Sequence, residues 1–250
     1  MRFENKPMEH DKIDPSSLDY SMFGPTDYLN FTLQRSEILF DINKAGRLIK
    51  SWSNGQGNEL DVVVAEKGSL LGERTVQCIS NEFDELRTTL DPISPKTIAD
   101  IGCGYAIFDL LAAKTYNSKI HLIDVETNGF RHFGFTNQAS AYSYLTTAKE
   151  FLTKNGISPA DITLTNPEKA DIMQSEPVDL AVSFLACGFH FPIDSYMPYF
   201  KEKIKHGGHI IIDIRKRTYS KQGLLLCILG SLTVLREAQS YVRVLVTKHA

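Results

Sequence analysis

The fold is decided by residues 97–105, which read T-I-A-D-I-G-C-G-Y. The mostly apolar run from Thr97 to Ile101 predicts a short buried strand, and residues 107–115 show the pattern of a helix. Between them lie Gly102 and Gly104, which permit a tight turn and let the backbone approach a ligand closely. The first turn of the helix presents unpaired N–H groups. This order of strand, glycine turn and helix predicts a ligand site at the end of a buried strand.

A second strand is predicted at residues 119–124, K-I-H-L-I-D, and it ends in Asp124. This acid follows the glycine turn by about 20 residues, the spacing at which a carboxylate can bind the ribose hydroxyls of a nucleoside-type ligand. Ligands of this kind sit at the carboxyl ends of parallel strands, where both the turn and Asp124 are expected. The sequence therefore predicts that Asp124 binds a ribose.

Asp100 and Ile107 distinguish between two classes of nucleoside ligand. A dinucleotide-binding turn favours a third glycine at the position of Ile107. A carboxylate two residues before the first glycine would repel a pyrophosphate, but it would attract a cation. The sulfonium and ammonium groups of S-adenosylmethionine fit such a site. An NAD-dependent oxidoreductase is therefore disfavoured.

The rest of the chain alternates between strand and helix patterns. Parallel strands need helical crossovers, so the alternation predicts an α/β fold with a Rossmann-like, doubly wound, mostly parallel sheet. A closing hairpin is expected to add an antiparallel edge strand. The predicted strands are 161–165, 178–186, 209–214, 232–237 and 241–247, and the predicted helices are 138–154, 195–205 and 220–229.

The first 95 residues have a different, mainly helical pattern. Apolar residues from Tyr28 to Trp52 recur at helical spacing and predict one long helix. A second stripe, from Val76 to Leu90, predicts another helix that ends before Pro92. We expect residues 1–95 to form a helical cap, lid or dimerisation region and residues 96–250 to form the cofactor-binding domain.

Two segments, D-I-G-C-G-Y and I-H-L-I-D, resemble the first signature segments of the class I S-adenosylmethionine-dependent methyltransferases. The resemblance covers residues 96–250 and implies that Asp124 holds the ribose and that Asn166 lies near the adenine. Ser183, in the fourth strand, is also expected at the cofactor site. Ala106 stands where the family often has a third glycine. The residues that the resemblance places around the methionine part are Asp100, Gly102, Cys103 and Gly104.

The segment C-G-F-H-F-P, residues 187–192, follows the fourth strand, whose end faces the transferred methyl group in this family. Methyl transfer to a hydroxyl requires alignment and loss of a proton, and a histidine has a suitable pKa for accepting that proton. His190 is therefore predicted as a general base or a substrate-orienting residue. A histidine that only packs within its loop is the alternative. Residues 187–196 also resemble bacterial methyltransferases assigned to sugars.

The leading hypothesis is methylation of a hydroxyl on a small molecule, a sugar or a secondary metabolite. The segment S-F-L-A, residues 183–186, replaces the N-P-P-Y of many enzymes that methylate bases or amide side chains. An N-methyltransferase or a macromolecule methyltransferase remains an alternative. A non-enzymatic nucleoside-binding module is another, although intact Asp100 and Asp124 disfavour it.

Composition limits the partners and the compartment. A net charge of −3 lacks the basic surplus of most nucleic-acid-binding proteins. Four separated cysteines without a C-x-x-C motif argue against a disulfide framework or a zinc site and fit a reducing cytoplasm. The longest apolar run, which starts at Leu224, is too short to span a bilayer, and the N-terminus does not resemble a secretory signal. We expect a cytoplasmic protein with a small-molecule acceptor, no nucleic-acid or membrane partner and no metal. A homodimer through the Val76–Leu90 stripe is left open.

Overall fold

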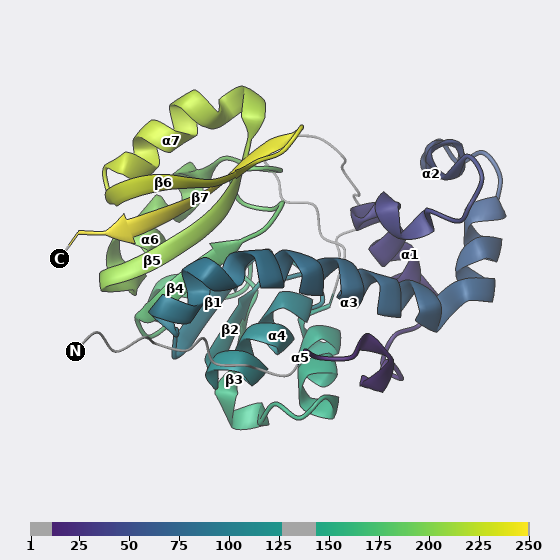
Figure 1. Ribbon diagram of the computed structural model, residues 1–250, viewed down its shortest axis with the longest axis horizontal. Coiled ribbons are helices and arrows are strands. Elements are labelled where there is room, and N and C mark those ends of the chain that lie inside the picture. Colours follow the sequence, from purple (N-terminus) through teal and green to yellow (C-terminus); the bar gives the residue numbers. More distant parts are fainter. Residues whose placement is uncertain (1–11, 127–143, 250) are drawn as a thin grey trace, which may run out of the picture.

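The computed structural model describes residues 12–126 and 144–249. Their strands form one sheet in the order β3-β2-β1-β4-β5-β7-β6 (Figure 1). Strands β1 to β5 are parallel, β7 runs antiparallel to β5, and β6 runs antiparallel to β7. The mostly parallel Rossmann-like sheet is thus confirmed, with both hairpin strands at one edge. The strands are β1 (Thr97–Ile101), β2 (Lys119–Ile123), β3 (Ile162–Thr165), β4 (Val178–Ser183), β5 (Ile204–Arg215), β6 (Gly230–Glu237) and β7 (Tyr241–Lys248).

The strand order reverses between β1 and β4, which creates the crevice where ligands of doubly wound sheets bind. The loops that follow these two strands come very close together. A Cβ on Gly102, just after β1, would lie 2.3 Å from the Cβ of Ala186. Only glycine fits here, because its φ of +79° is also in the left-handed region.

Helices cover both faces of the sheet, as alternating strand side chains require. On one face, Ile98, Leu122 and Leu180 share a core with helices α3, α4 and α5. On the other face, Ala99 and Ile212 share a core with α6 and α7. The four helices of the carboxyl-terminal part are α4 (Ile107–Tyr116), α5 (Leu145–Lys154), α6 (Met197–Lys203) and α7 (Tyr219–Cys227).

Of the three N-terminal helices, the first packs on the glycine turn, the third packs on α4 and contacts β7, and the second packs on the third. They are α1 (Pro25–Gln34), α2 (Ala45–Ser53) and α3 (Glu59–Ile93), and α1 and α2 gather around the first half of α3 (Figure 1). The rings of Phe23 and Phe31 lie 5.3 and 4.7 Å from the ring of Tyr105 in the turn. The Tyr105 hydroxyl donates a hydrogen bond to Asp27 and accepts one from Asn30. The glycine turn and α1 are therefore one packed unit.

Two predictions for the N-terminal helices are wrong. The single helix expected from Tyr28 to Trp52 is broken, because the chain leaves helical geometry at Arg35 and re-enters it after Lys44, whose φ is +58°. A short 3-10 turn between them still buries Ile38, so the apolar spacing persists across the break. The second helix is longer than expected: it runs from Glu59 through Pro92, with a kink at Gly68.

The ends of other helices and strands differ by a few residues from the ends predicted from the sequence, because sequence patterns locate the ends of an element poorly. Strand β4 ends at Ser183 rather than at residue 186. Helix α5 begins at Leu145, after Tyr144 in extended geometry, and residues 138–143 of its predicted range lie outside the described residues. Helix α3 has 35 residues but carries many charges. Within residues 12–126 and 144–249, no helix is both long and apolar enough to cross a membrane.

Candidate cofactor and acceptor site

A cavity of about 360 Å³ lies at the carboxyl ends of β1, β2 and β4, beneath the N-terminal helices. Its volume falls in the range of small-molecule sites, about 300–1,000 Å³. The glycine turn and the strand ends form one wall, and α1, α3 and β7 form the other. Of the predicted site residues, it is lined by Asp100, Gly102, Cys103, Gly104, Asp124 and His190.

The glycine turn is tied to the end of β2. The backbone N–H of Gly102 donates to the carbonyl of Ile123 at 2.7 Å, and that of Gly104 donates to Oδ2 of Asp124 at 2.9 Å. Both glycines have positive φ angles, and both line the cavity. The two features found in the sequence, the turn and the acid, are thus brought together at one edge of the sheet.

Ala106 occupies the position at which the methyltransferase family that the sequence resembles often has a third glycine. Its φ of +58° is left-handed, and its side chain is buried. A left-handed conformation costs a residue with a Cβ about 1–2 kcal/mol. The turn therefore keeps the glycine-type backbone geometry, although alanine occupies the position.

Asp100 and Asp109 form a buried pair of acids beside the turn. They are 4% and 0% exposed. Burial raises the pKa of both carboxyl groups, and the negative charge of Asp109 adds to the increase at Asp100. Oδ1 of Asp100 and both oxygens of Asp109 find no hydrogen-bond partner among the described residues. Because Asp100 also lines the cavity, its unpartnered oxygen fits a cationic ligand, as the methionine part of S-adenosylmethionine would be.

The loop after β4 is held in place by residues outside the cavity. Leu185 and Gly188 have φ angles of +53° and +86°. The Gln222 amide donates to the carbonyl of Gly188 at 3.0 Å, and Arg215 Nε donates to the carbonyl of Phe189 at 2.7 Å. Arg215 also lies over the Phe189 ring, 4.0 Å from its centroid. These contacts fix the loop backbone at the cavity wall.

His190 lies on this fixed loop and reaches the cavity. Its backbone N–H donates to the carbonyl of Ala186 at 2.7 Å. Its ring packs edge-on against the Phe189 ring, with centroids 5.1 Å apart. The side chain is half-buried, so a ligand can reach it. The structure thus brings His190 into the same cavity as Asp100 and Asp124.

Two other predicted cofactor residues do not line the cavity. The Ser183 hydroxyl donates to the carbonyl of Ile101 and accepts from the N–H of Cys187, which connects β1, β4 and the loop. Asn166 donates to Glu126 and accepts from the N–H of Glu168. In this structure both residues therefore support the backbone near the site, and direct contact of either with a cofactor stays a prediction.

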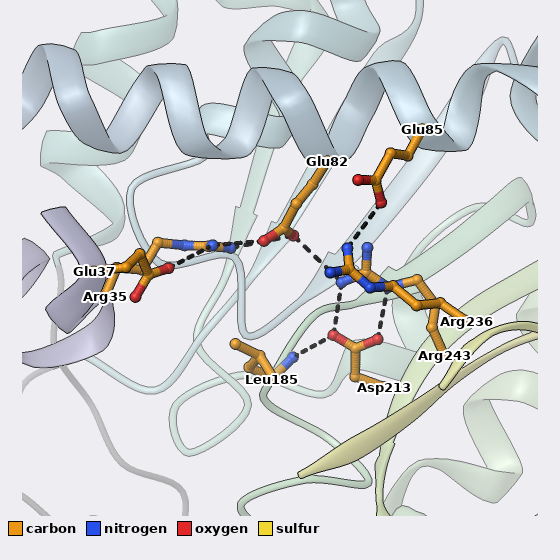
Figure 2. Close-up of polar contacts among 8 residues, drawn as sticks. All are labelled: Arg35, Glu37, Glu82, Glu85, Leu185, Asp213, Arg236 and Arg243. Atoms are coloured by element: carbon orange, nitrogen blue, oxygen red, sulfur yellow. Dashed lines mark hydrogen bonds and ion pairs between the residues drawn. The ribbon is translucent and has the colours of Figure 1, made fainter. Parts of the chain in front are cut away.

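A chain of alternating charges borders the opposite wall of the cavity (Figure 2). Arg35, after α1, donates to Glu82 of α3 at 2.7 Å. Arg243 of β7 contacts the same Glu82 at 3.4 Å and binds Asp213 of β5 with two hydrogen bonds of 2.7 and 2.8 Å. Asp213 also accepts a hydrogen bond from the N–H of Leu185 at 3.2 Å. These linked charges therefore extend to the start of the loop that carries His190.

The positive and negative charges of these linked side chains compensate one another. Burial alone would raise the pKa of Glu82, but hydrogen bonding and attraction by Arg35 and Arg243 lower it. Arg243 and Asp213 are almost completely buried. Sequence reasoning missed these residues, although Asp213 in I-I-I-D-I and Arg243 in Y-V-R-V-L-V are charges within apolar strands. Asp109 in I-F-D-L-L-A-A is a similar signal.

Aromatic and aliphatic side chains form most of the remaining wall. The guanidinium of Arg243 lies 4.5 Å from the centroid of the Phe184 ring, which packs against the Phe108 ring at 4.7 Å. Among the described residues there is no group of three or more His, Cys, Asp or Glu side chains that could hold a metal ion. The apolar residues that complete this part of the cavity are Phe31, Leu33, Ile79, Leu86, Phe189 and Tyr241.

Comparison with known proteins supports the fold. No family model matches the sequence. No curated protein sequence matches it either. Among solved structures, a protein of Nostoc punctiforme described as an O-methyltransferase is similar to this chain, with 12% identity and a TM-score of 0.51 over 70% of this chain and 59% of that one. The O-MT part of StiE, residues 961–1257, shows 14% identity and a TM-score of 0.50 over 68% of this chain and 74% of that one. The chain has the fold of the class I S-adenosylmethionine-dependent methyltransferases.

Proposed function

We propose that this protein is a methyltransferase that uses S-adenosylmethionine to methylate a hydroxyl group of a small molecule. The observation that carries the proposal is the meeting of Asp100, Asp124 and His190 in one cavity at the switch point of the sheet. A buried carboxylate without a partner suits a cation, and a carboxylate at the end of β2 suits a ribose. The fold, which is that of the class I methyltransferases, supports the same proposal.

Four residues are proposed to hold the cofactor. Asp100 would face its cationic methionine part, Gly102 and Gly104 would let it approach the backbone, and Asp124 would bind its ribose. When bound, the cofactor would supply an electrophilic methyl carbon that can bond to the acceptor oxygen as the carbon–sulfur bond breaks and S-adenosylhomocysteine leaves.

His190 is proposed to hold the proton that the acceptor hydroxyl loses. Its loop is fixed from outside the cavity by Arg215 and Gln222, which suits a residue that must hold one position. The aromatic rings of Phe184 and Phe189 would exclude water from the reacting atoms.

The acceptor is proposed to be small, because cofactor and acceptor would share a cavity of about 360 Å³ that α1 and α3 help to enclose. Its wall combines aromatic rings with the charged chain of Arg35, Glu82 and Arg243. A sugar or an aromatic alcohol could stack on the rings and hydrogen-bond to the charges. The N-terminal region would thereby act as the cap of the acceptor pocket. Cytoplasmic location belongs to the same proposal, since all four cysteines are free.

Calorimetry tests the cofactor assignment. We expect S-adenosylmethionine and S-adenosylhomocysteine to bind and NAD not to bind. Asp124→Ala should weaken binding of the first two about 10-fold or more, since a charge-assisted hydrogen bond contributes about 1.5–3 kcal/mol. Asp61→Asn, an exposed acid of α3, serves as the control and should leave binding unchanged. Tight binding of NAD, or unchanged binding by Asp124→Ala, would contradict the assignment.

Kinetics test the role of His190. We expect His190→Ala to keep cofactor affinity and to lower kcat by about 100-fold or more, because general bases contribute roughly 10²–10⁴-fold. The acceptor can be found by screening alcohols, sugars and amines for formation of S-adenosylhomocysteine. Full activity of the variant on its best acceptor would remove His190 from the mechanism.

A further inference from the structure

Asp109 has no role in the function proposed above, yet it is one of the most unusual residues of the chain. It lies in the first turn of α4 and is completely buried. Both of its carboxyl oxygens find no hydrogen-bond partner among the described residues, and the same is true of Oδ1 of Asp100. A buried polar group without a partner is costly, so its presence indicates a function.

The surroundings of the pair contain further acids rather than cations. Asp124, at the end of β2, raises the pKa of Asp100 by its negative charge. Cys103 in the turn is also buried near these acids, and burial together with the charges of Asp124, Asp100 and Asp109 raises the pKa of its thiol. No described lysine, arginine or histidine forms an ion pair with Asp100 or Asp109. Interaction with the Asp100 carboxyl group, and then with the backbone N–H of Asp109 itself, lowers the pKa of Asp109 and partly offsets the effect of burial.

Two adjacent carboxyl groups in a dry interior cannot both be charged without a large repulsion. One proton shared between them removes the repulsion and supplies a hydrogen bond, as in other buried carboxyl pairs. The proton then occupies the place of the missing cation. Asp109 thereby also determines how the carboxyl group of Asp100 is presented to the cavity.

We propose that Asp109 is a positioning residue that shares one proton with Asp100, and that the cationic methionine part of the cofactor replaces this proton when it binds. This inference rests on the proposed function. The charges balance, because S-adenosylmethionine carries one net positive charge and the released proton passes to the solvent. The pair would be singly charged without the cofactor and doubly charged beneath it.

The exchange predicts a dependence of cofactor affinity on pH. Below the pKa of the pair, S-adenosylmethionine should bind up to about tenfold more tightly for each unit of pH increase, because one proton is released on binding. Adenosine lacks the methionine part and should not displace the proton. Its affinity should therefore stay constant over the same range.

Calorimetry in two buffers with different ionisation enthalpies counts the released protons directly. At about pH 6, below the raised pKa of the pair, we expect wild-type protein to release close to one proton per S-adenosylmethionine and none per adenosine. Asp109→Asn should still bind S-adenosylmethionine, because its amide can donate to an ionised Asp100, but it should release no proton. Asp61→Asn is the matched control and should behave like the wild type.

A titrating histidine could also release a proton, so His190→Gln is measured in parallel and should keep the release. Wild-type protein that binds S-adenosylmethionine without releasing a proton would overturn the role of Asp109 and leave the cofactor assignment intact. The same release from Asp109→Asn as from wild type would also overturn it. Protein that does not bind S-adenosylmethionine at all would instead overturn the proposed function. The wild-type comparison of the two ligands decides the matter even if the variant fails to fold.

Discussion

Two groups of buried ionisable side chains border the same cavity, and they differ in whether a cation compensates each carboxyl group. In the chain of Arg35, Glu82, Arg243 and Asp213, each carboxylate binds a guanidinium. In the pair of Asp100 and Asp109, two acids face each other without a cation. Both groups project from the α3 side of the sheet, as the alternation of β1, β5 and β7 requires. Burial by itself therefore does not indicate the role of a charged side chain. The groups that lie against it do.

The compensated group connects parts of the chain that are distant in sequence. It joins the end of α1, the middle of α3 and two strands of the sheet (Figure 2). The uncompensated group connects only β1 to the helix that follows it. The first is thus suited to hold the N-terminal helices over the sheet, and the second is suited to receive a charge from outside.

The largest expected effect is the removal of a compensating cation. Arg243→Met would leave the buried charge of Asp213 without its main partner, which typically costs about 3–5 kcal/mol of unfolding free energy. Urea unfolding measures this loss. The double variant Arg243→Met, Asp213→Leu removes both charges and should recover most of the stability. A loss below about 1 kcal/mol in the single variant would show that the pair is not buried as described.

The opposite effect is expected from removing an uncompensated acid. The folded-state pKa of the pair lies above its value in the unfolded chain, so wild-type stability is full at low pH and falls as pH rises through the folded pKa. Asp109→Asn should therefore be more stable than wild type by about 1–3 kcal/mol near pH 8.5, and this gain should shrink as pH falls and be largely lost near pH 4, where the carboxyl group is also protonated in the unfolded chain. Unfolding at both pH values measures it. A gain that does not change with pH would count against a shared proton.

A smaller effect is expected at the cavity-side end of the compensated group. Arg35→Gln should lower the unfolding free energy by about 1–3 kcal/mol, because Glu82 keeps Arg243 as a partner but loses its 2.7 Å hydrogen bond. Urea unfolding measures the change. Since Arg35 lines the wall of the cavity that is proposed to bind the acceptor, the same variant should weaken acceptor binding more than cofactor binding. Equal loss for both ligands would argue against this division of the cavity.

The smallest effect is expected for an ion pair outside both groups. Lys216 and Glu237 are more than half exposed and lie 3.6 Å apart. Lys216→Ala should change the unfolding free energy by less than about 0.5 kcal/mol, because solvent screens such pairs. A loss comparable to that of Arg35→Gln would show that burial does not rank these interactions.

The sequence by itself determined the order of strands and helices from Thr97 onward, and with it the edge of the sheet at which the candidate site lies. Strand β1, the glycine turn, α4 and the position of Asp124 beside the turn were all predictable, because these residues are close in sequence. The single helix predicted from Tyr28 to Trp52 failed for the same kind of reason. Apolar spacing reports which side chains are buried, and Ile38 is buried whether or not the helix continues.

Only the tertiary structure decided which charges meet. Glu82 lies 47 residues from Arg35 and 161 from Arg243, so no local pattern relates them. Even Asp100 and Asp109, which are close in sequence, meet only because α4 folds back onto β1. A periodic pattern indicates the face on which a residue lies. The residue that lies opposite depends on how separate elements pack, and for buried charges that neighbour determines whether they stabilise the fold or await a ligand.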